Sequence, residues 1–297
     1  MKLTSHGRYD YSPIAGRPVY DWPNGKRLAV YLGLNLEHFA FGEGLGAELA
    51  PSAQPDVLNY AWRDYGNRVG AWRLIELFDA QRWPASVLVN SAMYDYAPQL
   101  IAAFRKRGDE IVGHGRTNSE RQGTFDEAAE RVLIAEATAR IANEEGRPPA
   151  GWLGPWISES AVTPDLLADA GYTYLLDWCM DEQPVFLRVR NGGRILAVPY
   201  PQEVNDIPAI VARKVGAEEF ADMIVDTFDE MLLQAETAPL VMGIALHAYI
   251  VGQPHRLKHL RRALSHIAAK RDDIWITTAG AIAEHCLNLP KGIVPGS

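Results

Sequence analysis

Leu28-Ala-Val-Tyr-Leu-Gly-Leu-Asn-Leu36 is a long apolar run that stops at Glu37-His38, and the fold is best read outward from it. Its length and its β-favouring side chains predict a buried strand. The polar pair that follows marks the end of that strand. Because a buried strand needs neighbours, the fold depends on whether the same pattern recurs along the chain.

Further short apolar runs have the same shape, namely Ala85 to Asn90, Glu110 to His114, Gly151 to Trp156, Tyr172 to Asp177, Ile195 to Tyr200, Leu240 to His247 and Ile274 to Thr277. Helical patterns, with apolar positions recurring at three and four, lie between them: Arg68 to Phe78, Pro98 to Arg107, Phe125 to Asn143, Ala217 to Leu233 and Arg256 to Ala269. Strands that alternate with helices favour an α/β fold with a parallel sheet. Roughly eight strands in one chain fit a closed barrel better than a doubly wound open sheet.

The domain organisation is predicted to be simple. The sequence contains no Ser-, Gly- or Pro-rich linker, no internal repeat and no low-complexity tract, so we expect a single barrel domain over 1–297 with an N-terminal extension at 1–27. A long segment, 42–59, follows the first strand and carries Glu43, Glu48 and Asp56. We interpret it as a lid, an oligomer contact or a surface insertion.

Composition excludes several classes of protein. The net charge of -8 argues against nucleic acid as a partner, because binding a phosphate backbone relies on clustered Lys and Arg. No stretch approaches the roughly 18 uninterrupted apolar residues of a membrane span, and the first residues lack the apolar core of a secretion signal, so a cytoplasmic location is expected. Cys179 and Cys286 are expected to be free thiols.

Polar residues at the strand ends are the candidate functional residues, because ligands of parallel α/β folds bind at the carboxyl ends of the strands. This rule selects Asn35, Glu37, His38, His114, Arg116, Asn118, Asp177, Trp178, Glu203, Asn205, Asp206 and His247. They supply carboxylates and imidazoles. The sequence therefore predicts acid–base chemistry at this end of the barrel.

Glu37, His114 and His247 are the predicted catalytic residues. A carboxylate can remove a proton from water and an imidazole can donate one to a leaving nitrogen, each step being worth about 10²- to 10⁴-fold in rate. We therefore assign Glu37 as the base and His247 as the acid. A single histidine at a strand end is ordinarily a hydrogen-bonded core residue, but three such histidines in one barrel favour a site.

Zinc-dependent hydrolysis and serine hydrolysis are the two other chemistries that fit a hydrolase. Glu37, His38 and His114 are suitable zinc ligands by type, but their spacing is not that of a compact zinc motif, so no metal is predicted. Zinc at His38 and His114 is the alternative. A serine hydrolase is disfavoured because the chain has no Gly-x-Ser-x-Gly elbow.

The order of these segments resembles the polysaccharide deacetylase (NodB-like) superfamily from about Leu28 to His285. The first motif of that family, Thr-Phe-Asp-Asp, aligns with Asn35-Leu-Glu-His38, its His-Ser/Thr-x-x-His with His114-Gly-Arg-Thr-Asn118, and its final Leu-His with Leu246-His247. Asp177-Trp178 takes the place of the fourth motif. The resemblance implies a distorted (β/α) barrel of the NodB-like polysaccharide deacetylase type.

The chain departs from the family pattern at the metal ligands. His38 stands where the family has its second Asp, Asn118 replaces the second metal His, and the third-motif Arg is absent from Trp152-Leu-Gly-Pro-Trp156. The string His247-Ala-Tyr-Ile-Val-Gly-Gln-Pro254 is similar to that of a cytoplasmic branch of metal-independent allantoinases and cyclic imide hydrolases. The resemblance to that branch implies ring-opening hydrolysis of a small cyclic amide by a homo-oligomer.

We therefore expect the chain to be a hydrolase of non-peptide C–N bonds that opens the ring of a small cyclic imide or amide. His114, with Arg116 or Asn118, would hold the developing oxyanion. The other predicted substrate contacts are Asn35, Trp156, Asp177, Trp178, Asn205 and Asp206, with Tyr200 as a further ring that could stack on the substrate. Three alternatives remain open: an allantoinase, a metal-dependent N-deacetylase of a sugar or amide, and a barrel that binds a ligand without turning it over.

Overall fold

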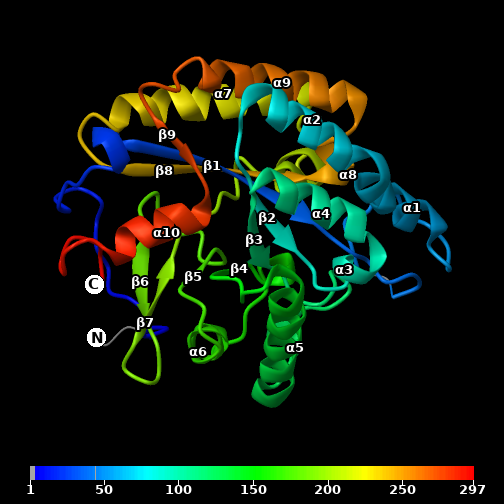
Figure 1. Cartoon of the computed structure of the whole chain (residues 1–297), viewed down its shortest axis with the longest axis horizontal. Helices are drawn as coiled ribbons and strands as arrows, with labels where there is room; N and C mark the ends of the chain where they lie inside the picture. Colours follow the sequence, from blue (N-terminus) through cyan, green and yellow to red (C-terminus); the bar gives the residue numbers. More distant parts are fainter. Residues whose placement is uncertain (1–3, 44) are drawn as a thin grey trace.

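The computed structural model describes residues 4–43 and 45–297, and its centre is a strongly curved sheet with helices along its outer face (Figure 1). The strands are β1 Leu28–Leu36, β2 Ser86–Val89, β3 Glu110–Gly113, β4 Gly151–Trp152, β5 Tyr174–Leu175, β6 Val185–Arg188, β7 Arg194–Ala197, β8 Leu240–His247 and β9 Trp275–Thr277. Their order in the sheet is β6-β7-β5-β4-β3-β2-β1-β8, with β9 paired to β1. The predicted α/β fold with a largely parallel sheet is confirmed.

The pairing is parallel throughout except between β6 and β7. The sheet curls into a barrel shape, but the seam between β8 and the far edge is not a regular ladder. It is bridged by single bonds, from the Ala245 amide to the Val204 carbonyl at 3.0 Å and from the Val241 amide to the Glu182 carbonyl at 2.9 Å. The predicted closed barrel is therefore a distorted one.

The helices are α1 Val57–Tyr65, α2 Ala71–Gln81, α3 Met93–Tyr96, α4 Pro98–Arg107, α5 Glu127–Glu145, α6 Thr163–Asp169, α7 Ala217–Gln234, α8 Ala248–Val251, α9 Pro254–Ala268 and α10 Ala279–Leu287. All five predicted helices are present. The one expected from Arg68 begins at Ala71 because a π-turn, Gly66–Gly70, joins α1 to α2. α1, α3, α6, α8 and α10 were not predicted.

The core lies on both faces of β1, as its two-sided apolar run predicted. Leu28, Val30, Leu32, Leu34 and Leu36 pack toward the helices, in a cluster with residues of α2, α4, α7 and α9. The alternate positions, Ala29 and Tyr31, face the interior of the barrel. Because side chains alternate along a strand, the same parity directs Asn35 and Glu37 inward at the carboxyl end.

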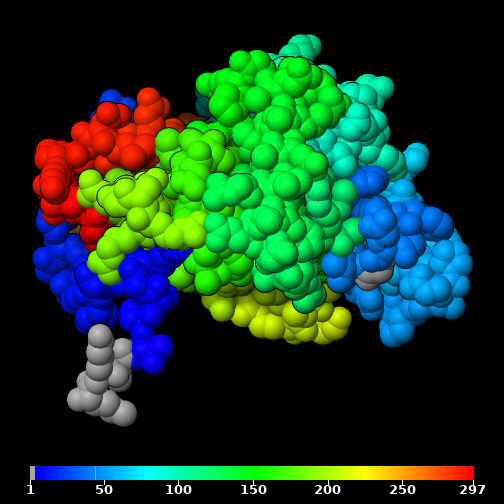
Figure 2. Space-filling model, turned by 90° about the horizontal axis from the view of Figure 1, so that it is seen from below, coloured from blue at the N-terminus to red at the C-terminus, as the bar shows by residue number. Residues whose placement is uncertain are grey.

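The predicted N-terminal extension packs along the edge strand β6; its residues 1–3 lie outside the described part. Figure 2 shows this blue segment beside the yellow-green hairpin of β6 and β7 and the red C-terminal segment. The Arg188 amide donates to the Arg8 carbonyl at 2.8 Å, and the Phe186 amide to the Pro295 carbonyl at 2.9 Å. Arg8 also forms an ion pair with Asp165 at 2.6 Å. These contacts cover an edge that would otherwise expose unpaired backbone groups.

Two expectations about the chain as a whole can be compared with the structure. Cys179 and Cys286 are free, as predicted. Across the described residues, no helix combines the length and the apolar composition that a membrane span requires.

The contact between the π-turn and α8 provides a test of the fold. A Cβ on Gly70 would lie 2.1 Å from the carbonyl oxygen of Ala248, which is rigid backbone. A helical Gly→Ala change ordinarily stabilises by up to about 1 kcal/mol. Here we expect Gly70→Ala to lower the free energy of unfolding by about 1–3 kcal/mol, because the two backbones must separate. Denaturant titration measures the change.

Arg68→Ala, in the same turn, is the control, since this side chain is 71% exposed. Loss of its surface ion pair should leave the free energy of unfolding close to that of the wild type, because solvent screens exposed charges. A Gly70→Ala protein as stable as the wild type would contradict the close packing of these segments.

Candidate active site

A cavity of about 260 Å³ opens at the carboxyl ends of β1, β3 and β8. Its polar lining consists of Asn35, Glu37, His114, Asn118, Gln202, Asn205 and His247. Its apolar and aromatic lining consists of Phe39, Ala47, Leu153, Trp156, Ile157, Tyr200, Ile207, Pro208, Ala212 and Tyr249. The three residues predicted to be catalytic therefore line one cavity.

Glu37 is the centre of the polar cluster. One carboxylate oxygen, Oε1, lies 3.6 Å from His114 Nε2 and 3.6 Å from His247 Nε2. The same oxygen accepts a hydrogen bond from Asn118 Nδ2 at 2.5 Å. The other oxygen, Oε2, is buried and has no hydrogen-bond partner within the described residues. It is therefore free to accept a hydrogen bond from water.

Asp206 holds His247 in place. Its Oδ1 lies 2.6 Å from His247 Nδ1, and its Oδ2 accepts the His247 backbone amide at 2.7 Å. An Asp206 carboxylate therefore fixes the Nδ1 proton and directs Nε2 at Glu37. Asp206 was predicted to contact the substrate, but it is fully buried behind His247 and does not line the cavity. Its position makes it the group that orients the imidazole.

His114 has a different partner. Its Nδ1 lies 2.7 Å from the Leu153 carbonyl oxygen, which accepts only, so Nδ1 carries a proton. Nε2 therefore faces the cavity and has no hydrogen-bond partner of its own among the described residues. It can accept a hydrogen bond when neutral and donate one when protonated.

The protonation states follow from these contacts. Burial raises the pKa of Glu37, but the neighbouring His247 and His114 outweigh burial and hold it at about 2. Burial lowers the pKa of His247, but the carboxylates of Asp206 and Glu37 raise it to about 10. Between these values Glu37 is a carboxylate and His247 an imidazolium. The base is then ionised and the acid carries its proton.

The orientation of the Asn118 amide bears on the zinc alternative. The His38 backbone amide donates to Asn90 Oδ1 at 2.9 Å, so Asn90 must present its Nδ2, which donates to Asn118 Oδ1 at 3.0 Å. Asn118 is left with its NH₂ group facing Glu37. An NH₂ group cannot ligate a metal, so the position of the second zinc histidine offers no ligand.

His38 does not supply the missing ligand. Its ring packs at a tilt against Tyr96, with the ring centroids 4.9 Å apart, and borders a separate small pocket with Tyr60 and Asp64. His114 instead faces the main cavity. In the part of the chain that the structure describes, no three His, Cys, Asp or Glu residues are grouped as a metal site would require. The residues present do not fit the zinc site that the family implies.

The predicted substrate contacts divide evenly. Asn35, Asn118, Trp156 and Asn205 line the cavity, whereas Arg116, Asp177, Trp178 and Asp206 do not. Arg116 forms ion pairs with Glu120 and Glu136 near the surface. Asp177 is buried and accepts the Gly154 amide at 2.7 Å, and Trp178 donates to Glu159 at 2.7 Å. These last two support the cavity wall from behind, where they cannot touch a ligand.

The 42–59 segment, apart from Gly44, which lies outside the described residues, covers one side of the site. Ala47 lines the cavity, and its carbonyl accepts from Arg63 Nη1 at 3.2 Å. Asn59 holds the segment by hydrogen bonds: its Oδ1 accepts from the backbone amides of Leu49 and Ala50, and its Nδ2 donates to the Ala50 carbonyl. The position favours the predicted lid over a plain insertion, and the oligomer contact stays a prediction.

Sequence reasoning missed three groups of the site. Asn90, which orients Asn118, ends a predicted strand and could have been selected by the strand-end rule. Tyr249 stands two residues after His247, in a string that the sequence analysis quoted without giving the tyrosine a role. Ile207 and Pro208 reach the cavity through a π-turn, 207–212, that carries no local signal.

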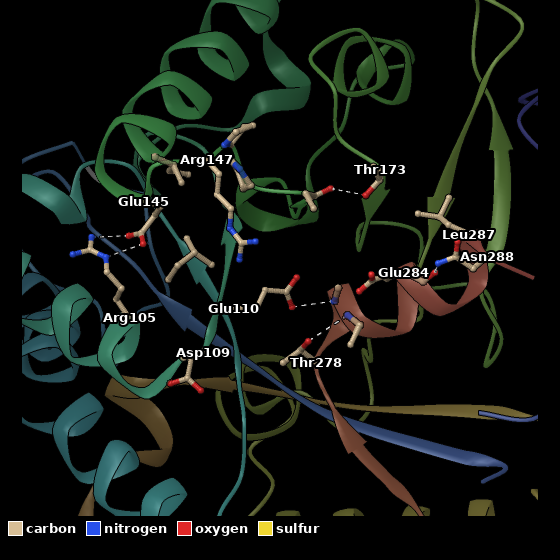
Figure 3. A pocket seen from close by; sticks show the side chains of 18 residues that line it. Arg105, Asp109, Glu110, Glu145, Arg147, Thr173, Thr278, Glu284, Leu287 and Asn288 are labelled. Atoms are coloured by element: carbon tan, nitrogen blue, oxygen red, sulfur yellow. Dashed lines mark hydrogen bonds and ion pairs between the residues drawn. The ribbon is translucent and has the colours of Figure 1, made fainter. Parts of the chain in front are cut away.

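A larger hollow of about 830 Å³ lies at the amino ends of β3, β4 and β5 (Figure 3). Arg105 pairs there with Glu145 at 2.8 Å, and Glu110 accepts bonds from Ser86, Tyr174 and Gly280. These charges are matched by neighbours and lie opposite the catalytic end of the strands. We therefore read this end as structural.

Over most of its length the chain is similar to proteins named as polysaccharide deacetylases and to an allantoinase. No model of a known protein family matches it. It is 24% identical over 306 residues to a putative polysaccharide deacetylase of Schizosaccharomyces pombe. This alignment covers 93% of this chain and 95% of that protein. The solved structures similar to it include Puue allantoinase, at a TM-score of 0.76 and 26% identity over 89% of this chain and 91% of that one. The structure of a probable polysaccharide deacetylase of Pseudomonas aeruginosa has a TM-score of 0.75 and 25% sequence identity to this chain. The match covers 89% of this chain and 92% of that one.

The contact between Asp206 and His247 predicts a titration result. In Asp206→Asn a buried negative charge is lost while burial still disfavours the imidazolium, so the pKa of His247 should fall from about 10 toward its ordinary value of 6.5, with the Glu37 carboxylate still raising it. NMR titration of the histidine side chains measures this without a substrate. Glu203→Gln, at an exposed carboxylate nearby, is the control and should leave His247 unchanged. An unaltered His247 in Asp206→Asn would mean that Asp206 does not set its charge.

Proposed function

Since the chain belongs to the NodB-like polysaccharide deacetylase superfamily, we propose that it is an amide C–N hydrolase that opens a small cyclic imide or amide. The observation that carries the proposal is the pairing of Glu37 with a His247 held by Asp206, in a cavity that lacks the zinc ligand set. The finer assignment is to the metal-independent branch that includes allantoinases and cyclic imide hydrolases.

The size and walls of the cavity support a small flat substrate. About 260 Å³ is below the range of roughly 300–1,000 Å³ that drug-sized ligands occupy. Trp156, Tyr200 and Phe39 provide aromatic surface for a ring. A sugar polymer would instead need an open groove with several subsites. A ring of five or six atoms matches both features.

In the proposed mechanism, water bound at Glu37 Oε2 loses a proton to that carboxylate and its oxygen attacks one carbonyl carbon of the ring. A C–O bond forms and the carbonyl oxygen becomes an oxyanion. His247 then transfers the proton of Nε2 to the ring nitrogen, and the C–N bond breaks. The product is an open-chain amide with a new carboxyl group. The proton on Glu37 returns to His247, which restores both groups.

The coupling between the two groups explains how a carboxylate with a pKa of about 2 can act as a base. His247 is the neighbour that lowers the pKa of Glu37 most. As the imidazolium gives up its proton to the substrate, that positive charge disappears and the basicity of Glu37 rises. Proton removal and proton donation therefore favour each other. Acid–base catalysis of this kind contributes about 10²- to 10⁴-fold per group.

The direct test is a substrate screen with purified protein, with and without a chelator, against succinimide, dihydrouracil, hydantoin, allantoin and an acetylated sugar oligomer. We expect ring opening of at least one cyclic compound, unaffected by chelator. Glu37→Gln and His247→Ala should each lower kcat by about 10²-fold or more. His266→Gln, at an exposed histidine on α9, is the control and should keep wild-type activity.

Other outcomes of the same screen would identify the alternatives. Chelator-sensitive release of acetate would indicate a metal-dependent deacetylase. Tight calorimetric binding of a ring that is never opened would indicate a binding protein. Inertness toward every cyclic compound would rule out the proposed reaction.

The charges of the site also predict a broad pH profile. Activity requires ionised Glu37 and protonated His247, so it should fall on the acid side toward about pH 2 and on the alkaline side near pH 10. For a substrate that does not itself ionise, kcat/KM should be flat from about pH 4 to pH 8, because this ratio reports the free enzyme. An alkaline fall near pH 6.5 would show that His247 is not held as an imidazolium.

A further inference from the structure

Three buried polar atoms at the cavity have no hydrogen-bond partner within the described residues. They are Glu37 Oε2, His114 Nε2 and the hydroxyl of Tyr249. An unsatisfied buried polar atom destabilises a fold, so each one that a native protein keeps requires an explanation. The proposed mechanism gives a role to Glu37, and the sequence predicts that His114 holds the developing oxyanion. The Tyr249 hydroxyl has none.

The Tyr249 ring is held so that its hydroxyl has a fixed direction. The edges of Trp62, His247 and Phe39 contact it, with ring centroids 5.0, 5.9 and 6.2 Å away. On the backbone side it meets Gly66, where a Cβ would lie 2.6 Å from the Tyr249 amide nitrogen. A π-turn inside a helix is often found at a functional site, and here its first glycine admits the tyrosine. The ring is therefore positioned before any ligand binds.

The hydroxyl is also confined to one chemical state. Burial raises the pKa of Tyr249 well above its ordinary value, and the carboxylates of Glu37 and Asp206 raise it further. The group therefore keeps its proton at every working pH. His114 Nε2, in contrast, donates only when the ring is protonated, because Nδ1 already holds a proton for Leu153. Tyr249 is thus a hydrogen-bond donor whose proton does not depend on pH.

We propose that Tyr249 is a further catalytic residue. Its hydroxyl donates a hydrogen bond to the oxygen of the carbonyl group whose C–N bond is broken. The inference rests on the proposed function. Water at Glu37 attacks that carbonyl carbon, and the bond from Tyr249 strengthens as the oxygen becomes negative. It follows that the substrate presents a carbonyl oxygen to Tyr249 and its ring nitrogen to His247.

Tyr249→Phe tests the inference, because the two side chains have the same shape and only the unpartnered hydroxyl is removed. With a ring that the wild type opens, kcat should fall by about 10²- to 10³-fold, as for other oxyanion donors, while KM changes by a few-fold at most. The alkaline limb of the pH profile should stay in place, because His247 is unaltered. The thermal midpoint should be equal to or above that of the wild type, since no hydrogen bond is lost.

Tyr172→Phe is the matched control. Tyr172 is a buried tyrosine away from the cavity, and its hydroxyl is hydrogen-bonded to Thr138 at 2.7 Å. This variant should show the opposite pattern, with a lowered thermal midpoint and unchanged kcat.

The outcomes separate the two proposals. If the wild type opens a ring and Tyr249→Phe opens it within threefold of the same rate, Tyr249 is not catalytic and the proposed function stands. The same conclusion follows if kcat and the thermal midpoint fall together, since that pattern indicates a structural role. A wild type inert toward every cyclic compound overturns the proposed function, and the role of Tyr249 with it.

Discussion

The buried carboxylate of Glu37 is the constraint on which the rest of the site depends. Burial alone would neutralise it, and only the adjacent imidazoles and amide keep it ionised. Each of these partners is held by a group behind it: His247 by Asp206, His114 by Leu153 and Asn118 by Asn90. These residues belong to strands and turns far apart in the chain. The sheet must therefore curl until its ends meet, and the cavity is the space that this curl encloses.

The fold could be predicted from the sequence where a strand is buried on both faces. The runs at Leu28–Leu36 and Leu240–His247 match β1 and β8. Both strands are buried at every position, so their sequences are almost continuously apolar and can be recognised. The run predicted from Gly151 shortens to two residues, since Pro155 cannot donate to a neighbouring strand. The antiparallel strand Val185–Arg188 was missed, although the Gly192 turn after it is a hairpin signal.

The site could be predicted only from the rule that ligands bind at the carboxyl ends of parallel strands. Parallel strands bring their carboxyl ends together, so Glu37, His114 and His247 could be grouped without a structure. The role of Asp206 could not, because it depends on one isolated bridge between Asn205 and Ala245 that brings the chain back to β8. Nor could that of Tyr249, whose direction is set by packing. Residues of the right type were selected, but which of them face the cavity depends on turns without a sequence signature.

The charges at the centre also constrain the substrate that the proposed reaction can use. A zinc ion would polarise a carbonyl strongly and lower the pKa of bound water. The described residues offer instead one imidazolium, His247, between the carboxylates of Glu37 and Asp206. This arrangement polarises a carbonyl far less. An imide reacts more readily than the amide of an acetylated sugar, because its nitrogen shares one lone pair between two carbonyl groups. Each carbonyl carbon is therefore more electrophilic, and the nitrogen is a better leaving group. The side chains at this site therefore favour the proposed cyclic imide over an acetylated sugar as substrate.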